Sequence, residues 1–188
     1  VLTKRDKQII RFIEDFGAIT RKQVEALFFS NVKYSTSLAN KRLLNIIKEP
    51  YIARSREPYS NQYIYHLKGI KQLEHRILRS EFYLRLITLG GQIKTFVSEY
   101  RASNLRADAF CVYEKDGFRY YFCLEVQTEN KLDIDKYIGL YESDDWPFKV
   151  FPRVVAITDR KIEVETEFLL FVVGKNFEGW DKIFKTCP

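Results

Sequence analysis

Two carboxylates on neighbouring predicted strands are the side chains of this sequence best placed to do chemistry. Asp108 lies in the alternating run 107–113, and Glu125 lies near the end of the next run, 120–126. A Lys-Asp-Gly sequence at 115–117 predicts a hairpin turn between the two runs. The two carboxylates should therefore lie side by side, and carboxylate oxygens are ligands that Mg²⁺ uses in phosphoryl-transfer sites.

This spacing resembles the metal-binding signature of the PD-(D/E)xK nucleases, in which an Asp on one strand faces a Glu-x-Lys triplet on its partner. The third position of the triplet is Gln127 here, so the signature lacks the lysine that positions the attacking water. Lys131 and Lys136 follow, and either could replace that lysine. The alternative is that Asp108 and Glu125 are surface or structurally paired carboxylates on an ordinary sheet.

The charge of the chain is concentrated in its N-terminal part. The 188 residues carry a net charge of +6, but residues 1–78 contain 15 Lys and Arg against 7 Asp and Glu. Residues 79–188 contain 16 against 18. Because clustered cations attract a phosphate backbone, a net charge of +8 beside one of −2 predicts an N-terminal nucleic-acid-binding module. The alternative is a solvated surface that happens to be basic.

The elements predicted for the N-terminal part are three helices and a hairpin. Helical spacing of apolar residues and alternation place them as follows: helices from Lys4 to Phe16, after Thr20 and between Tyr34 and Pro50, then strands at 51–56 and 62–67 around a turn at 57–61. Ser35, Thr36 and Ser37 offer caps for the third helix. This order resembles a winged helix-turn-helix, in which the third helix enters the major groove of DNA and the hairpin reaches the backbone or minor groove.

Polar and basic side chains occupy the positions that such a fold would turn toward DNA. They are Ser37, Asn40, Lys41, Arg42 and Asn45 on the third helix, and Arg54 and Arg56 on the first hairpin strand. Asparagine can pair with adenine edges, and arginine or lysine with guanine or phosphate. The alternative is that the helices and hairpin serve as a protein-binding platform with a solvated polar face.

The remaining chain predicts a linker helix and a second domain. The amphipathic stretch 68–89 ends at a Gly-Gly pair, and we divide the chain into a DNA-binding domain (1–78), a linker (79–91) and a nuclease-like domain (92–188). The elements expected after the linker are strands at 93–100, 107–113, 120–126, 153–158 and 168–173, and helices at 133–142 and 178–184. A strand, helix, strand order implies a parallel crossover, so we expect an α+β fold with a mixed sheet.

Several short runs together resemble the replication-relaxation family of plasmids, integrative elements and phages. They are Leu105 to Phe110, Phe122 to Glu129, the helix from Lys136 to Tyr141, and Leu73 to Arg76. The resemblance covers most of the chain and implies an N-terminal winged helix joined to a nuclease-like domain. It also implies a role in plasmid replication and DNA relaxation, or in regulation. Ala107 stands where the signature usually has proline, and Gln127 where it has lysine.

Two functions follow as expectations. The favoured one is a DNA-binding protein of a mobile element, acting in replication, DNA relaxation or transcriptional control, with a catalytically silent second domain and no cofactor. We expect it to bind double-stranded DNA as a homodimer through the 68–89 helix, with replication or transcription proteins as further partners. The alternative is a Mg²⁺-dependent nickase or endonuclease that uses Asp108 and Glu125 as ligands.

Composition argues against several other classes of protein. No apolar run approaches the ~20 residues of a membrane span, so we expect a cytoplasmic protein. The three cysteines, Cys111, Cys123 and Cys187, form no CxxC pair, which argues against a structural zinc site or a disulfide framework.

Overall fold

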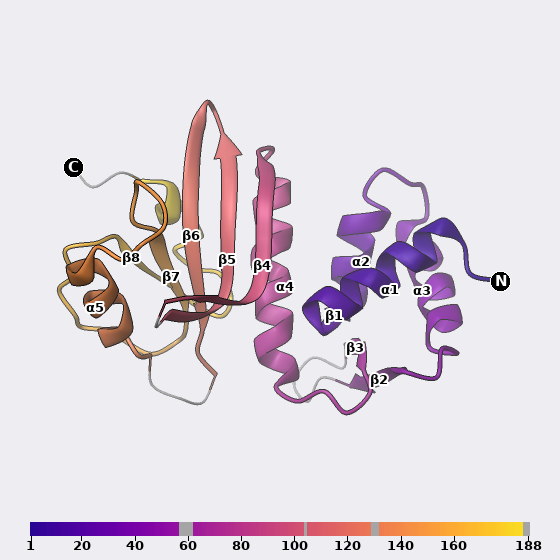
Figure 1. Ribbon diagram of the computed structural model, residues 1–188. Coiled ribbons are helices and arrows are strands. Elements are labelled where there is room, and N and C mark those ends of the chain that lie inside the picture. The colour runs from indigo at the N-terminus through magenta and orange to yellow at the C-terminus, as the bar shows by residue number, and fades with distance from the viewer. Residues whose placement is uncertain (57–61, 104, 129–131, 186–188) are drawn as a thin grey trace. The chain divides into compact units, whose positions relative to one another are not determined.

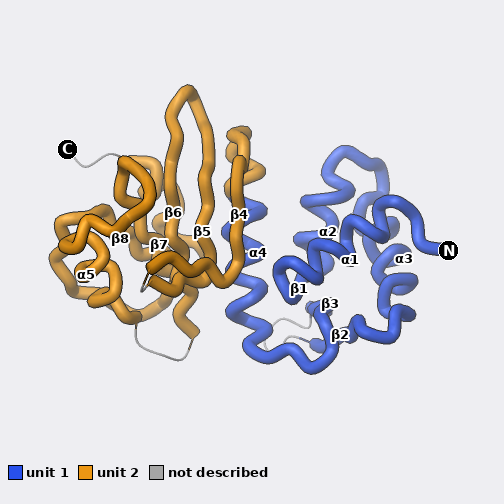
Figure 2. Tube along the Cα trace, viewed as in Figure 1, with its two compact units in different colours: residues 1–85 blue, residues 86–188 orange. Residues whose placement is uncertain are grey.

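The chain folds as two compact units, Val1–Arg85 and Leu86–Pro188 (Figure 2). The computed structural model describes residues 1–56, 62–103, 105–128 and 132–185, and the turn predicted at 57–61 lies outside these ranges. Each unit contains its own β-sheet, and the second sheet is mixed, so the predicted α+β class is confirmed. Within the described ranges, no helix is long and apolar enough to cross a membrane.

The first unit begins with three helices of the predicted kind. They are α1 (Lys4–Phe16), α2 (Arg21–Phe28) and α3 (Ser35–Ile46) (Figure 1). Thr3 and Asp6 form a capping box at the start of α1, and Gly17 ends that helix with a φ of 86°, which a glycine adopts without strain. Of the five apolar residues expected to be buried along α3, Ala39, Leu43 and Ile46 are fully buried, and Leu38 and Ile47 are half-buried.

The small sheet of the first unit has one strand more than the sequence predicted. Strands β2 (Ile52–Arg56) and β3 (Tyr63–Leu67) form the expected antiparallel pair. Strand β1 (Ala18–Thr20) pairs with the other side of β3, which gives the order β1-β3-β2. A three-residue strand is too short to show alternation, and all three residues of β1 are buried, so no pattern in the sequence marks it.

The start of α3 differs from the prediction. Tyr34 is the N-cap residue, with a φ of 63°, and no side chain caps the helix. The hydroxyl groups of Ser35 and Thr36, expected to be caps, donate instead to the Glu25 carboxylate on α2. They therefore fix α3 against α2, and their two hydrogen bonds are the main causes that lower the pKa of Glu25.

Helix α4 (Leu73–Thr88) begins five residues later than the predicted 68 and is anchored to the first unit by buried polar groups. The Arg79 side chain is fully buried and donates to the Phe16 carbonyl at the end of α1, at 2.9 Å. Ser80 donates to the Ala18 carbonyl at 3.0 Å. A cation is favourable at a helix C-terminus, where carbonyl groups point outward without helical partners.

The second unit is built on a five-stranded sheet in the order β4-β5-β6-β7-β8. The strands are β4 (Gln92–Ala102), β5 (Leu105–Lys115), β6 (Phe118–Val126), β7 (Arg153–Ile157) and β8 (Leu170–Val173). The first three are antiparallel, and β7 and β8 run parallel to β6. The crossover from β6 to β7 contains α5 (Asp135–Ser143), which confirms the predicted parallel crossover (Figure 1).

Two predicted elements near the C-terminus differ from the structure in length or type. The strand expected at 168–173 begins at Leu170, and the closing helix expected at 178–184 is a single 3₁₀ segment, η1 (Trp180–Phe184). The core between α5 and the sheet contains Phe110 and Cys123 from the strands and Tyr137 and Leu140 from the helix. Helix α5 is therefore held on the sheet face that also carries Asp108 and Glu125.

Candidate functional site

Asp108 and Glu125 lie next to each other where strands β5 and β6 stop pairing. The last backbone pair of this antiparallel ladder joins Ala109 to Leu124, so one further step places Asp108 opposite Glu125. The Asp108 Oδ2 atom accepts a hydrogen bond of 2.6 Å from the Val126 amide. The Asp108 carboxylate thus takes the place of a backbone carbonyl and fixes its own position beside Glu125.

Helix α5 delivers two further side chains to the Glu125 carboxylate. The Lys136 Nζ atom lies 2.8 Å from Glu125 Oε1, and the Tyr137 hydroxyl donates to the same oxygen at 2.5 Å. Lys136 also donates to the Arg106 carbonyl at 2.6 Å. Both contacts fall on one carboxylate oxygen, Oε1, and the donors come from adjacent residues at the start of α5.

The protonation of Glu125 is set mainly by burial. Glu125 is 9% exposed, and the loss of water around its carboxyl group raises the pKa of that group to about 7. The Lys136 charge and the hydrogen bonds from Lys136 and Tyr137 lower this pKa, while the Asp108 charge raises it. The carboxyl group therefore titrates near neutral pH, where a cation close to it would favour the charged form.

The structure places the remaining residues of the predicted catalytic set as follows. Gln127, which occupies the lysine position of the signature, is 7% exposed, and its backbone N–H donates a hydrogen bond to the Ile157 carbonyl. Lys131 lies outside the described residues. Of the two lysines that could replace the missing one, Lys136 is the one that the structure shows at Glu125.

The two carboxylates fit the requirements of Mg²⁺ better than those of a structural metal. Mg²⁺ commonly binds through one or two carboxylates and keeps several water molecules, whereas structural zinc needs about four protein ligands. No group of three or more His, Cys, Asp and Glu side chains that could hold a metal occurs in the described part of the chain. The charge of Asp108 beside Glu125 is the kind of repulsion that a bound cation relieves.

A second candidate site is the exposed face of α3 in the first unit. Ser37, Asn40 and Lys41 are exposed and Asn45 is half-buried, opposite the buried stripe of that helix. Leu44 lies among them and is 51% exposed, so the face also carries one apolar side chain. The predicted polar face of the third helix is therefore present and open.

The hairpin of the first unit holds its two arginines on an aromatic ring. Arg54 and Arg56 are exposed on β2, and their guanidinium carbons lie 4.2 and 5.3 Å from the ring centre of Tyr63 on β3. Arg56 also donates to the Tyr63 hydroxyl at 3.2 Å, and this hydrogen bond is the main cause that lowers the pKa of Tyr63. Stacking of this kind restricts a flexible arginine while leaving its charge in water.

Arg42 differs from the other cations of the predicted DNA-binding set. Its side chain is 28% exposed and lies 3.4 Å from the Asp6 carboxylate, which is fully buried at the start of α1. Asp6 already accepts from the Thr3 amide as part of the capping box. Arg42 is therefore engaged in holding α3 against α1.

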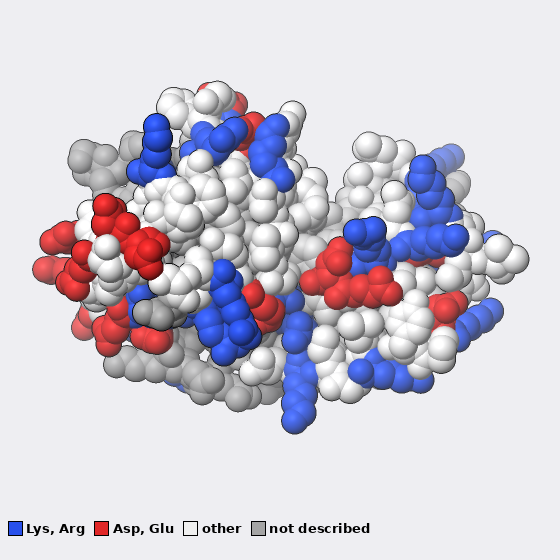
Figure 3. All heavy atoms as spheres, viewed as in Figure 1, with Lys and Arg blue, Asp and Glu red and all other residues white. Residues whose placement is uncertain are grey.

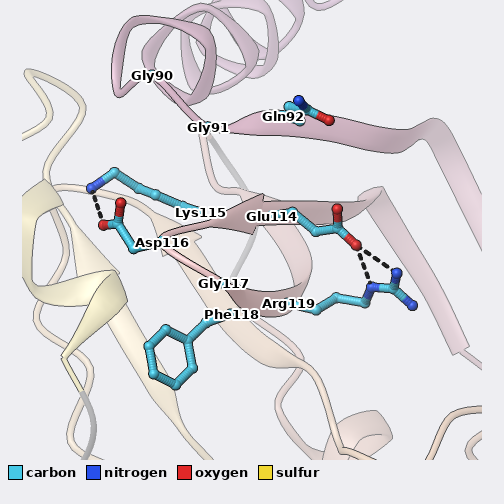
Figure 4. A pocket seen from close by; sticks show the side chains of 9 residues that line it. All are labelled: Gly90, Gly91, Gln92, Glu114, Lys115, Asp116, Gly117, Phe118 and Arg119. Carbon is cyan, nitrogen blue, oxygen red and sulfur yellow. Dashed lines mark hydrogen bonds and ion pairs between the residues drawn. The ribbon is translucent and has the colours of Figure 1, made fainter.

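Charge is distributed differently over the two units. On the face seen in Figure 3, lysine and arginine side chains spread over the first unit, and acidic side chains gather over α5 of the second. A pocket of about 620 Å³ lies at the β5–β6 turn (Figure 4). This turn is at the opposite end of the β5–β6 ladder from Asp108. Its charges are already paired, Glu114 with Arg119 and Lys115 with Asp116.

Two tyrosines that contact the candidate sites were not among the predicted site residues. Tyr137 lies in the helix predicted at 133–142, and Tyr63 lies in the strand predicted at 62–67. The contact of Tyr63 with the arginines could have been predicted by aligning the two hairpin strands, because Tyr63 pairs directly with Arg56. No spacing rule would have found the Tyr137 contact, because it depends on how α5 packs over the end of β6.

Comparison with family models, with curated proteins and with solved structures finds no match for this chain. The resemblance to the replication-relaxation family therefore stays a prediction. Functional inference rests on two features of the described residues. One is the open face of α3 with its neighbouring hairpin, and the other is the buried cluster around Glu125.

Proposed function

We propose that this chain is a double-stranded DNA-binding protein and that its first unit is a winged helix-turn-helix. The observation that carries the proposal is the pairing of an exposed polar helix face with a hairpin whose arginines are held in place. Asn40 and Lys41 on α3 could contact base edges and phosphates, and Arg54 and Arg56 on β2 could contact the backbone or the minor groove.

The salt dependence of binding tests this proposal. Replacing Lys41, Arg54 and Arg56 with alanine should weaken binding to duplex DNA and flatten the slope of log affinity against log salt. The expected change is roughly 0.9 in slope for each phosphate that the variant no longer binds. Fluorescence anisotropy with a labelled duplex at several salt concentrations measures it.

The matched control removes the same number of charges from the second unit. Lys149, Lys182 and Lys185 are exposed there, and their triple alanine variant should keep the wild-type slope. An unchanged slope in the first variant, or an equal change in both variants, would contradict DNA binding through α3 and the hairpin.

A second candidate function is metal-dependent cleavage of DNA by a second unit of the PD-(D/E)xK type. The observation in its favour is the position of Lys136, 2.8 Å from Glu125 Oε1. The sequence predicted a catalytically silent second unit, because Gln127 cannot supply a positive charge. Lys136 would supply that charge from α5 instead. Asp108 and Glu125 would hold Mg²⁺, which would contribute positive charge against the developing charge on phosphate. Lys136 would hold the Glu125 carboxylate in place and contribute its own charge beside it.

The wider role that we propose is action on the DNA of a plasmid, phage or integrative element, in replication, DNA relaxation or transcriptional control. A homodimer would suit a two-fold DNA site. Of the apolar side chains of α4 that suggested it as the interface, Leu78, Phe82 and Leu84 are buried within the chain, whereas Ile87 is 41% exposed. Light scattering at tens of micromolar, with and without duplex DNA, tests the dimer, and a monomer in both conditions would contradict it.

A further inference from the structure

Strand β6 extends beyond its parallel neighbour β7 at one end of the sheet. Residues 118–121 of β6 pair with β5 on one side, whereas pairing with β7 begins only at Phe122, opposite Arg153. Within the described ranges, no strand pairs with residues 118–121 on their other side. The end of β6 therefore leaves a recess at the sheet edge, where a neighbouring strand would otherwise lie.

A pocket of about 420 Å³ lies at this recess, and all of residues 118–121 line it. The nine lining residues comprise five aromatic, two aliphatic and two arginine side chains. None of these described lining residues is acidic, although residues 79–188 contain more Asp and Glu than Lys and Arg. The pocket is therefore an aromatic and cationic surface within a slightly acidic part of the chain.

Aromatic rings border the pocket on both faces of the sheet, because neighbouring strand residues point to opposite faces. The ring centre of Tyr120 lies 5.2 Å from that of Phe184. The ring centre of Tyr121 lies 5.0 Å from that of Phe148. Phe118, beside the β5–β6 turn, is 66% exposed. A flat ring that enters along the edge of β6 would meet aromatic side chains on each face, and such side chains are typical of sites that stack unpaired nucleobases.

The arginine on β7 is held in place by neutral groups. Arg153 donates to the carbonyl groups of Ile183 and Lys185 at 2.6 and 3.0 Å. Its guanidinium carbon lies 5.0 Å from the ring centre of Tyr120. Carbonyl groups and rings carry no net charge, so these contacts fix the guanidinium without cancelling its positive charge.

The arginine on β6 shares its carboxylate partner with a second cation. Arg119 pairs with Glu114 on β5, and Lys94 on β4 lies 3.1 Å from the same carboxylate. The three side chains together keep one positive charge, and the Arg119 side chain is 57% exposed. The pocket therefore favours a ligand that combines a flat ring with a negative charge.

We propose that this pocket binds an unpaired nucleotide of a DNA strand, with its base against Phe118 and Tyr120 and its phosphate facing the two arginines. The proposal rests on the proposed DNA-directed function and deepens it, because a base can enter the recess only when it is unpaired. Five residues of strand separate Tyr120 from Glu125, roughly 17 Å at the rise of a β-strand. The pocket is therefore separate from the carboxylate cluster, and binding to it can be measured without cleavage.

Binding of single-stranded DNA by the full chain tests this proposal. The protein carries the Lys41, Arg54 and Arg56 to alanine changes, and the buffer contains EDTA, so that neither the proposed duplex-binding cations nor cleavage contribute. Two labelled 12-mers are compared by fluorescence anisotropy, one of thymidine and one with the same phosphates but without the central bases. We expect the thymidine strand to bind about tenfold more tightly, which corresponds to one base stacked on an aromatic ring.

The variant Phe118→Ala should lose most of this preference for the base-bearing strand. Because Phe118 is mostly exposed, its replacement should leave the melting temperature of the protein unchanged. The matched control is Val164→Ala, at an apolar side chain of the same unit that is 47% exposed and lies outside this pocket. The control should keep the tenfold preference.

The variant Arg119→Ala should weaken both strands alike, because it removes a phosphate contact and no contact with a base. Its slope of log affinity against log salt should flatten by roughly 0.7. Lys161→Ala is the control, since Lys161 is also exposed and paired with a carboxylate, that of Glu163, but lies outside this pocket. It should keep the slope of the parent protein.

Equal affinity for the two strands, or a preference that survives Phe118→Ala, would overturn the proposal. The first result would leave the unpaired edge of β6 to an extended peptide, which pairs through its backbone. An equal change of slope in the Arg119→Ala and Lys161→Ala variants would also contradict a phosphate contact in this pocket. Failure of duplex binding by α3, or of cleavage, would leave these measurements unaffected.

Discussion

The two units place their basic side chains in opposite surroundings. In the first unit, Arg54 and Arg56 are exposed to water and stack on the ring of Tyr63, so salt can screen their charges. In the second unit, the Lys136 side chain is 20% exposed and its charge lies beside the Glu125 carboxyl group, whose pKa is raised to about 7 by burial. Exposed charges suit reversible attraction to a phosphate backbone. A buried pair with a shifted pKa suits chemistry at one defined position.

The largest effect that we expect concerns cleavage by the second unit. If the wild-type protein nicks supercoiled plasmid with Mn²⁺, Lys136→Ala should lower the rate about 100-fold, because a preorganised charge at a reacting phosphate contributes that much. Asp108→Ala and Glu125→Ala should abolish the Mn²⁺-dependent nicking itself, because these two carboxylates would hold the metal. Gel electrophoresis of the plasmid over time measures the rates.

Lys149→Ala is the control for this experiment, since Lys149 is an exposed lysine of the same unit. It should nick at the wild-type rate. Loss of cleavage in this control, or a Lys136→Ala variant as fast as the wild type, would contradict a special position for Lys136. A wild-type protein without Mn²⁺-dependent nicking would contradict the second candidate function and leave DNA binding as the only proposed activity.

The next effect is on stability and follows from Glu125. Burial raises the pKa of its carboxyl group to about 7 from an ordinary value of 4.5. Between pH 4.5 and 7 the unfolded chain has lost this proton and the folded chain keeps it, so the free energy of unfolding falls as pH rises. The total fall from this group is at most about 3 kcal/mol, and it is complete above pH 7.

Glu125→Gln should remove this pH dependence. Both tryptophans, Trp146 and Trp180, belong to the second unit, so their fluorescence follows its unfolding in urea at pH 5 and at pH 8. The wild-type protein should lose more stability between these two pH values than the variant does. Glu163→Gln, at an exposed glutamate, should behave as the wild type. Equal pH dependence in Glu125→Gln and the wild type would show that Glu125 ionises normally.

The helices and strands were predicted well from the sequence, but contacts between side chains far apart in the chain were predicted poorly. Helical spacing and alternation predicted α1 to α3, the hairpin and the crossover, because those patterns depend on residues close in the chain. The pairing of Asp108 with Glu125 was predictable for the same reason, since a short turn joins their strands. The approach of Lys136 to Glu125 was only one of two alternatives, because it depends on where α5 packs. The Arg42 contact with Asp6 joins residues 36 positions apart and had no signal in the sequence.

The smallest expected effect separates two adjacent residues of α3. Arg42→Ala leaves the fully buried Asp6 carboxylate without its nearby cation and should lower the free energy of unfolding of the first unit by about 1 kcal/mol. Lys41→Ala removes an exposed charge and should change stability by less than ~0.5 kcal/mol. Urea unfolding followed by far-ultraviolet circular dichroism measures both.

Affinity for duplex DNA should show the reverse order for these two variants. Lys41 is open to a phosphate, whereas Arg42 is held by Asp6, so Lys41→Ala should weaken DNA binding more than Arg42→Ala does. The pair of measurements therefore distinguishes a side chain that serves the fold from one that serves the ligand. If Arg42→Ala keeps full stability and weakens DNA binding as much as Lys41→Ala, Arg42 belongs to the DNA-binding face that the sequence predicted for it.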